Sequence, residues 1–260
     1  MYWTLGGRYS RWYMSENDDK EGYDTMADAG MAKEQLYFNN FYRRKYIQMK
    51  RIKDVEQNPD FKYSIQIPKF LSSEKCDELI EQITTTEEMV PGGVGGEHGE
   101  CAIIPEIRKT KEWYLFDQPL NPHRPDKCNG DWQWLQDKIY EVVKIVNQGV
   151  FKFDIEMPDK ELKLIKYEKG DFFGWHTDYN AGDCSTRKLV ALIQLTDPSE
   201  YEGLETQFGI QDKDTKEWYT MNKLKGSLTI FPTFMCHNVT PITKGTRYVI
   251  QELFIGNHFR

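Results

Sequence analysis

The chain has 260 residues, of which 39% are hydrophobic, and a formal net charge of -7 at pH 7. This length is enough for one large domain with its own buried core. The acidic balance argues against a general polyanion-binding protein, so nucleic acid is not the expected partner. No stretch approaches the about 18 consecutive apolar residues of a membrane span, and the segment 1–8 lacks the apolar core of a signal peptide. We therefore expect a cytoplasmic protein without membrane partners.

Residues 1–60 differ in composition from the rest of the chain. They contain many tyrosines, an acidic cluster at 15–21, and a segment rich in helix formers and basic residues at 31–55. Aromatic residues recur in that segment at helical spacing, which predicts a helix with one face packed on the main domain. The alternative is an arm that uses its basic residues to bind RNA or a protein partner. We treat 1–60 as a partly helical N-terminal extension and 61–260 as the main domain.

The first half of the main domain mixes strand and helix patterns. Alternation predicts a strand over 62–68, and 70–83 is typical of a helix with an N-cap serine and carboxylates in its first turn. The glycine-dense run 90–100 lacks the lysine and hydroxyl residue of a phosphate loop, so we interpret it as flexible, with the part around Gly92 to Gly99 a candidate lid over a substrate. A further strand is predicted over 107–116.

The second half indicates an all-β shell with one more helix. Apolar residues at helical spacing predict an amphipathic helix over 131–147 that packs on the outside of a barrel. Strands are predicted over 151–155, 162–167 and 188–195, with a hairpin of 204–210 and 218–224. Many strands and no βαβ alternation favour a mainly β fold with flanking helices, a double-stranded β-helix (jelly roll, cupin-like). Such a shell also serves lectins and capsids, so it does not determine an activity.

Three residues predict a metal site. His176 and Asp178 are two positions apart, so in an extended chain their side chains point to the same face. A second histidine, His237, follows 59 residues after Asp178, at the end of an apolar strand. Two imidazoles and one carboxylate on one face of an octahedron suit non-haem Fe(II) and leave positions open for substrate and O2.

Cysteine does not supply an obvious alternative ligand. The five cysteines are an odd number, widely spaced, without a Cys-x-x-Cys pair, so free thiols are expected. Cys236 adjoins His237, but in a strand its side chain would point to the opposite face, which favours a structural role over metal binding. The cysteines are Cys76, Cys101, Cys128, Cys184 and Cys236.

The order of these motifs resembles a known family. The series His176-x-Asp178, His237 and Arg247 is similar to the 2-oxoglutarate and Fe(II)-dependent dioxygenases. Tyr167-x-x-Gly before Trp-His-Thr-Asp, the run 195–203, Gly-Ser-Leu at 226–228 and the run 237–247 resemble more closely the prolyl 4-hydroxylase-like branch with its PKHD-type hydroxylases. The resemblance covers roughly residues 61–256.

The resemblance implies a mechanism and a role for each residue. Fe(II) would be held by His176, Asp178 and His237, while Arg247 and the hydroxyl of Tyr167 would hold the far carboxylate of 2-oxoglutarate. Oxidative decarboxylation with O2 would yield succinate, CO2 and a hydroxylated substrate, with ascorbate as a candidate reductant. Gln194 stands where some prolyl hydroxylases carry a second tyrosine, so that part of the pocket departs from the pattern. We interpret Phe173 and Trp175, which flank the ligands, as core packing in preference to substrate stacking.

The substrate stays open at this point. By resemblance it is a prolyl or other amino acid side chain in a peptide, or a small molecule. A nucleic-acid demethylase of the same superfamily would need a basic groove and commonly a second arginine, yet only Arg260 follows Arg247. A binding module or zinc hydrolase on the same shell has no evident use for Arg247 together with Tyr167.

Overall fold

The computed structural model describes residues 62–87, 89–95, 101–116, 130–159 and 162–259. The predicted helix at 31–55, the thiol of Cys128 and most of the candidate lid lie outside these residues. Within the described part, no helix is both long and apolar enough to cross a membrane.

The larger sheet joins strands that are distant in sequence. At its centre, β17 (Arg247–Ile255) lies between β10 (Arg187–Gln194) and β8 (Lys163–Tyr167), antiparallel to both. These strands are largely buried, as their continuous apolar runs predict. The order continues through β14 (Leu228–Pro232) to β1 (Ile65–Ile67) on one side and through β6 (Lys111–Tyr114) to β2 (Met89–Pro91) on the other, and β7 (Met157–Pro158) pairs with the end of β17.

A second antiparallel sheet faces the first. Its strands are, in spatial order, β13 (Trp218–Thr220), β12 (Thr206–Gln211), β15 (His237–Val239), β9 (Phe172–His176) and β5 (Arg108–Lys109). Two short pairs accompany it, β11 (Tyr201–Gly203) with β16 (Ile242–Gly245) and β3 (Val94–Gly95) with β4 (Cys101–Ala102). This arrangement confirms the predicted double-stranded β-helix.

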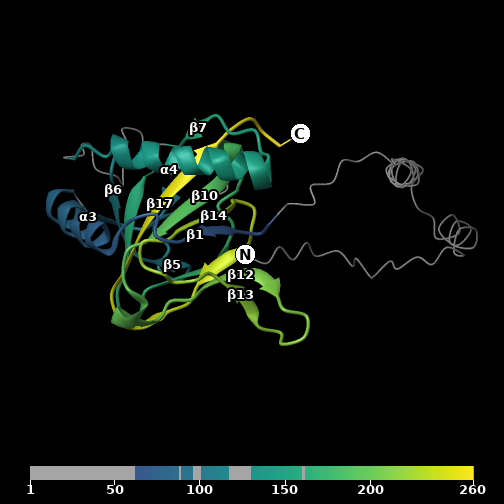
Figure 1. Cartoon of the computed structure of the whole chain (residues 1–260). Helices are drawn as coiled ribbons and strands as arrows, with labels where there is room; N and C mark the ends of the chain where they lie inside the picture. Colours follow the sequence, from purple (N-terminus) through teal and green to yellow (C-terminus); the bar gives the residue numbers. More distant parts are fainter. Residues whose placement is uncertain (1–61, 88, 96–100, 117–129, 160–161, 260) are drawn as a thin grey trace, which may run out of the picture. The chain divides into compact units, whose positions relative to one another are not determined.

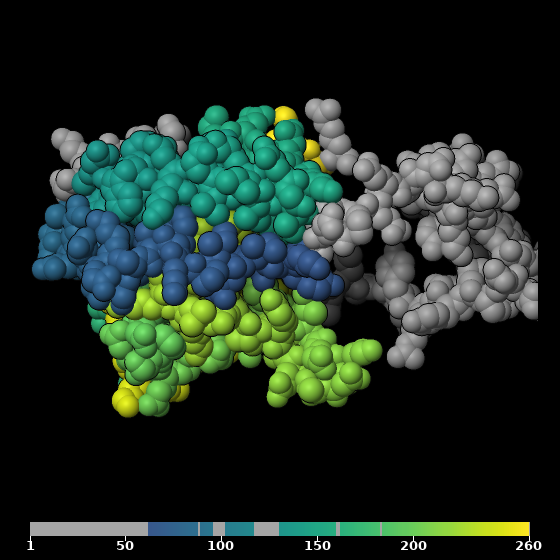
Figure 2. Space-filling model, in the orientation of Figure 1, coloured from purple at the N-terminus to yellow at the C-terminus, as the bar shows by residue number. Residues whose placement is uncertain are grey.

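Two helices cover the outer face of the larger sheet. Strand β10 shows the layering, because Leu189, Ala191 and Ile193 pack toward the helices while Val190 and Leu192 pack toward the second sheet. The helices are α3 (Ser73–Thr86) and α4 (Gln133–Val146), and α4 runs across the strands of the sheet in Figure 1. In Figure 2 the segment from β1 through α3 forms a band between α4 and the strands beyond residue 200. Their buried core residues include Leu79, Ile83, Leu135, Ile139 and Val143.

The two helices predicted within the described residues are confirmed with small shifts. Helix α3 begins at Ser73, where the side chain of Ser72 accepts a hydrogen bond from the Lys75 backbone, as an N-cap serine should. Helix α4 continues into a π-helical turn, η1 (Asn147–Phe151). Short 3-10 helices are η2 (Gly182–Thr186) and η3 (Pro198–Glu200).

The strand predicted over 151–155 is wrong. The Asn147 side chain donates to the Phe153 carbonyl and accepts from the Phe153 N–H, at 2.8 and 2.9 Å. Lys152 adopts a left-handed φ of 59° and its N–H bonds back to the Asn147 carbonyl. The backbone is thus satisfied locally and needs no strand partner.

Two further boundaries differ from the prediction. The expected strand over 107–116 is divided into β5 and β6, which belong to different sheets. The run 90–100, expected to be flexible, contributes the end of β2 and all of β3, while 96–100 lie outside the described residues. The chain around 92–110 therefore connects the two sheets.

We predict that Gly226→Ala lowers the free energy of unfolding by at least about 2 kcal/mol. Gly226 has a φ of +76°, and a Cβ there would lie 2.2 Å from the Leu71 carbonyl oxygen. The left-handed conformation alone costs an alanine about 1–2 kcal/mol. Gly149→Ala is the matched control, because a Cβ at Gly149 meets nothing within 4 Å. Urea denaturation measures both variants, and equal destabilisation would contradict the packing described.

Candidate metal centre

The two histidines of the candidate site face each other across neighbouring strands. His176 ends β9 and His237 begins β15, and the two residues are direct partners in the antiparallel pairing. Their ring centroids are 4.1 Å apart. His237 thus starts a short strand after the turn that follows β14, and does not end an apolar strand as predicted. Strand pairing, not sequence proximity, brings the two imidazoles together.

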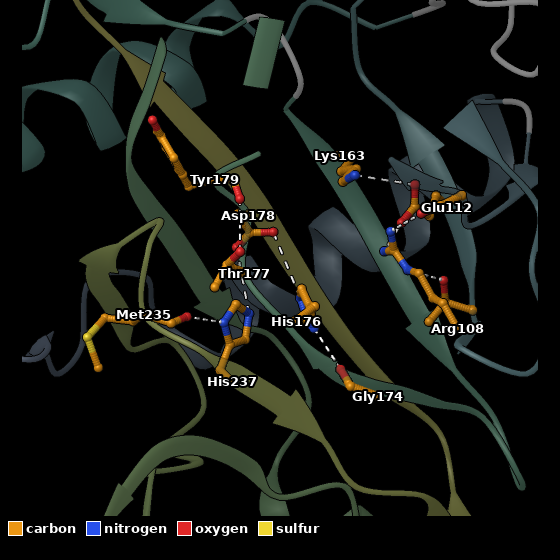
Figure 3. Close-up of polar contacts among 12 residues, drawn as sticks. Arg108, Glu112, Lys163, Gly174, His176, Thr177, Asp178, Tyr179, Met235 and His237 are labelled. Carbon is orange, nitrogen blue, oxygen red and sulfur yellow. Dashed lines mark hydrogen bonds and ion pairs between the residues drawn. The ribbon is translucent and has the colours of Figure 1, made fainter. Parts of the chain in front are cut away.

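The carboxylate of Asp178 completes the group. Asp178 lies two residues beyond β9, and its backbone N–H donates to the Thr233 carbonyl at 2.9 Å. One oxygen, Oδ1, is 3.9 Å from His176 Nε2, and the other, Oδ2, is 3.6 Å from His237 Nε2. One ligand atom from each of the three residues lies within 4.8 Å of the others. Figure 3 shows the three side chains converging on one point.

Hydrogen bonding determines which nitrogen of each ring is available. His176 Nδ1 lies 2.8 Å from the Gly174 carbonyl, and His237 Nδ1 lies 2.9 Å from the Met235 carbonyl. Carbonyl oxygens only accept, so each Nδ1 carries the hydrogen and each Nε2 of the neutral ring presents a lone pair. Burial, and secondarily the neighbouring His237, lower the pKa of His176 well below its ordinary value, which keeps this ring neutral.

These donors fit a bound metal cation. Asp178 Oδ2 is buried and makes no hydrogen bond within the described residues. Three groups that present lone pairs therefore converge without a hydrogen atom between them, which is unfavourable unless a cation lies there. Two imidazoles and a carboxylate suit Fe(II). The Phe173 ring stacks on His176 at 3.5 Å, and the Phe231 ring meets His237 edge-on at 5.1 Å, so aromatic surface holds both ligands in place.

Arg247 is a buried residue of the larger sheet. It opens β17 as predicted, is 2% exposed, and is the cross-strand partner of Tyr167 on β8. Its Nε donates to Gln194 Oε1 at 2.8 Å, and one terminal nitrogen lies 3.4 Å from the Thr206 hydroxyl. It makes no ion pair within the part of the chain that the structure describes. Burial lowers the pKa of Arg247, yet an arginine stays charged.

The surroundings of Arg247 fit an anionic ligand. A buried guanidinium without a carboxylate partner is costly, and a bidentate carboxylate would satisfy it. Tyr167 is 3% exposed, its hydroxyl makes no hydrogen bond among the described residues, and burial raises its pKa so that it stays a donor. Gln194 donates to the Tyr201 hydroxyl at 3.2 Å and accepts from Arg247, so it orients the guanidinium where a tyrosine was expected from the resemblance.

A second buried arginine lies close to the metal centre. Arg108 of β5 is 6% exposed and lies over the Phe173 ring at 4.5 Å, on the residue that stacks against His176. Its guanidinium donates to Glu112, to the Thr110 hydroxyl and to the Gly93 carbonyl. Glu112 also accepts from the Tyr114 hydroxyl at 2.7 Å and lies 3.4 Å from Lys163 Nζ. Unlike Arg247, Arg108 is fully paired (Figure 3).

The other site predictions have mixed outcomes. Phe173 packs in the core as expected, whereas the expectation for Trp175 is wrong, because Trp175 is 40% exposed and pairs with Trp218 at 4.9 Å. The side chain of Cys236 is exposed and takes no part in the metal-binding group, and Cys76 is a buried free thiol. Sequence reasoning missed Arg108 and Tyr201. Tyr201 could have been found, since it lies in the run 195–203 that carries the family resemblance.

Comparisons with known proteins agree with this geometry. Residues 162–254 match the family model of the 2OG-Fe(II) oxygenase superfamily. The PKHD-type hydroxylase YbiX of Escherichia coli is 28% identical over 114 residues, which are 41% of this chain and 49% of YbiX. A PKHD-type hydroxylase of Synechococcus is 27% identical over 184 residues, which are 69% of this chain and 72% of that protein. The chain thus spans about half the length of the first of these relatives.

A solved structure shows the same fold. The prolyl hydroxylase from Trichoplax adhaerens, in complex with a hypoxia inducible factor oxygen degradation domain peptide fragment, has a TM-score of 0.56 at 14% identity. The match covers 88% of this chain and 96% of that chain. The sequence matches thus make residues 162–254 similar to the 2OG-Fe(II) oxygenases, and the structural match shows that the chain shares the fold of a prolyl hydroxylase. Among these proteins the chain is similar to the prolyl hydroxylase-like oxygenases, and this likeness implies Fe(II), 2-oxoglutarate and O2.

We predict that Glu112→Gln lowers the free energy of unfolding by about 3–5 kcal/mol, because it removes the carboxylate that pairs with the buried Arg108 and lies 3.4 Å from Lys163 Nζ. Glu141→Gln breaks an exposed pair with Lys144 and should cost far less, because water screens that pair. Chemical denaturation at neutral pH compares the two. A cost for Glu112→Gln no larger than that of the control would contradict a structural role for the network.

The same network predicts a pH dependence. Burial alone would raise the pKa of Glu112, but Arg108 and Lys163 outweigh it, and the pKa lies below its ordinary value. The stabilisation is therefore present above the unfolded-state pKa of about 4.3 and is lost as pH falls through the lower folded-state value. We expect the difference in stability between wild type and Glu112→Gln to shrink as the pH falls below about 4.3. A difference that grows in acid would contradict this sign.

Proposed function

We propose that this protein is a 2-oxoglutarate- and Fe(II)-dependent dioxygenase that hydroxylates a prolyl or other amino acid side chain. The observation that carries the proposal is the convergence of His176 Nε2, His237 Nε2 and an Asp178 oxygen that no described residue hydrogen-bonds, in a buried site. In this proposal, residues 61–260 are the oxygenase domain and 1–60 an extension to it.

His176, Asp178 and His237 are the proposed metal ligands. The hydrogen bonds from both Nδ1 atoms to backbone carbonyls fix the ring orientations and the tautomers before any metal arrives. The two backbone carbonyls belong to Gly174 and Met235, residues of the same turns and strands that carry the histidines, so each ligand is oriented locally. One face of the metal would then stay open, as dioxygen chemistry requires.

Arg247 and Tyr167 are the proposed binding residues for the far carboxylate of 2-oxoglutarate. The guanidinium offers two parallel donors, and Gln194 fixes its plane through the 2.8 Å hydrogen bond at Nε. Tyr167 Oη adds a third donor from the neighbouring strand. The low exposure of all three side chains excludes water from the carboxylate.

Fe(II) held by His176, Asp178 and His237 would, together with 2-oxoglutarate and O2, supply the oxidation that converts a C–H bond into C–OH, with 2-oxoglutarate converted to succinate and CO2. The surrounding residues keep water away from this chemistry. Phe208 and Phe231 lie in the inner core and contact His237 through their rings, at centroid distances of 6.3 and 5.1 Å. Ascorbate is expected only as an added reductant.

Support for an amino acid side chain as substrate comes from the relatives. The PKHD-type hydroxylases and the prolyl hydroxylase of known structure are the proteins to which the chain is similar, and the latter was solved with a peptide fragment. A peptidyl substrate is therefore the first to test, ahead of a free amino acid or small metabolite.

We predict a visible metal-to-ligand charge-transfer band when Fe(II) and 2-oxoglutarate are added to the purified protein without oxygen. His176→Ala should lose iron binding and the band, since one imidazole ligand is gone. Arg247→Ala should retain iron but lose the band at 2-oxoglutarate concentrations that saturate the wild type. Each variant is the control for the other, with iron content measured separately. Wild-type protein that binds iron and gives no band would contradict the proposed cosubstrate.

A further inference from the structure

A cavity of about 410 Å³ lies near the last described residues, apart from the cosubstrate residues. It lies between the chain that follows η1, the start of β10 and the chain that follows β17. None of its residues was assigned a role by the sequence patterns. The lining residues are Lys152, Phe153, Asp154, Lys188, Asn257, His258 and Phe259.

Lys188 is the unusual member of this cavity. The residue is 1% exposed, and its ammonium group is buried without a hydrogen-bond partner within the described residues. The Phe259 ring covers it, with Lys188 Nζ 3.7 Å from the ring centroid. Desolvation lowers the pKa of Lys188, and Asp154 opposes this shift without forming an ion pair. A lysine is almost never kept in this state without a counter-ion.

The other charges of the cavity leave an excess of positive charge. The single carboxylate, on Asp154, already accepts a hydrogen bond from Asn257 Nδ2 at 2.8 Å. Lys152 is exposed at the rim, and His258 Nδ1 lies 3.1 Å from the Ser185 hydroxyl. The cavity thus contains two ammonium groups and one occupied carboxylate, which favours an anionic ligand.

Aromatic rings define the shape of the site. Phe153, Phe234 and Phe259 meet edge-on, with centroid distances of 5.8 to 6.1 Å. Tyr179 joins them, with its ring centroid 5.7 Å from that of Phe259. A ligand here would place an anionic group on Lys188 and apolar surface against these rings.

Backbone hydrogen bonds connect the wall of the cavity to the metal centre. The Thr233 carbonyl accepts from the N–H groups of Asp178 and Tyr179, and the Thr233 N–H donates to the Lys188 carbonyl at 3.0 Å. Lys188 and Asp178 are therefore separated by at most two strand spacings, roughly 10 Å. Figure 3 shows the Tyr179 side chain directed away from the histidines, on the far side of Asp178. A substrate several atoms long could reach both places.

We propose that Lys188 and the surrounding aromatic rings form a substrate subsite that binds a carboxylate next to an apolar group. This inference rests on the proposed function, because a substrate subsite presupposes that the protein hydroxylates a substrate. It adds that the substrate carries a carboxylate near the hydroxylated carbon. The carboxylate belongs to an acidic side chain of a peptide or to the free end of a peptide or amino acid. Its binding does not require iron or 2-oxoglutarate.

The test is an NMR titration of the full-length, isotope-labelled protein with phenylacetate and with phenylacetamide, its neutral isostere. We expect phenylacetate to shift the resonances of Phe259 and His258 and to bind about tenfold more tightly than the amide, because a charge-assisted hydrogen bond to Lys188 is lost in the amide. Lys188→Met should remove this preference for the anion. Equal affinities of the two probes for the wild type would overturn the proposal.

Two controls separate the subsite from general effects. Lys138→Met removes another lysine that lies over a phenylalanine ring, 4.8 Å from that of Phe70, and should leave phenylacetate binding unchanged. Lys188→Met should keep or raise the melting temperature, because Met removes a buried charge without a partner. A Lys188→Met variant that folds and still prefers phenylacetate would overturn the proposal. If Lys188→Met does not fold, the affinities of phenylacetate and phenylacetamide for the wild type decide whether the proposal stands.

Two peptides then distinguish the sources of the carboxylate. One carries a single aspartate and blocked ends, and the other has no acidic side chain and a free C-terminal carboxylate. The peptide whose binding falls about tenfold in Lys188→Met carries the carboxylate in the accepted position. Equal binding of each peptide to wild type and Lys188→Met would exclude the subsite. A missing charge-transfer band in the iron titration would instead contradict the oxygenase function and leave these binding results standing.

Discussion

The convergence of three lone pairs without a hydrogen atom between them is the constraint on which this structure depends. The ring N–H groups of His176 and His237 both donate to backbone carbonyls, and Asp178 Oδ2 accepts no hydrogen bond from any described residue. The β9–β15 pairing places the two rings directly opposite each other, and the Thr233 carbonyl anchors the backbone of Asp178. Strand pairing in the second sheet therefore holds together three lone-pair-bearing groups. Their proximity is unfavourable unless a cation binds between them.

Buried charged side chains follow a consistent pattern. Those that stabilise the fold form ion pairs, as Arg108 and Lys163 do with Glu112. Arg247 and Lys188 are also buried, but neither makes an ion pair within the described residues. Since an unpaired buried charge is destabilising, it is retained where a ligand provides the counter-charge. The two cations have different neighbours, because Arg247 is the cross-strand partner of Tyr167 on β8 whereas the backbone of Lys188 is bonded to Thr233, so they suit two different anions.

The sequence allowed the shell and its central strands to be predicted, because β8, β10 and β17 are long apolar runs and the metal-site motif has an ordered spacing. It could not show Arg108, which reaches the site only because β5 pairs with β9 across more than sixty intervening positions. The irregular segment after α4 was mistaken for a strand, since the hydrogen bonds of one side chain, Asn147, replace strand pairing there. Lys188 also lies at the start of an apolar strand, and nothing in the neighbouring sequence reveals that its ammonium group makes no hydrogen bond to the described part of the chain.

The most direct test of the central claim is a crystal structure of the protein grown anaerobically with Fe(II), with anomalous data collected at the iron absorption edge. We predict one strong anomalous peak at about 2.1 Å from His176 Nε2, His237 Nε2 and a carboxylate oxygen of Asp178. We also predict that the rings of both histidines keep their hydrogen bonds to the carbonyls of Gly174 and Met235. A peak elsewhere, or a metal bound without Asp178, would contradict the claim that these three residues are the iron ligands.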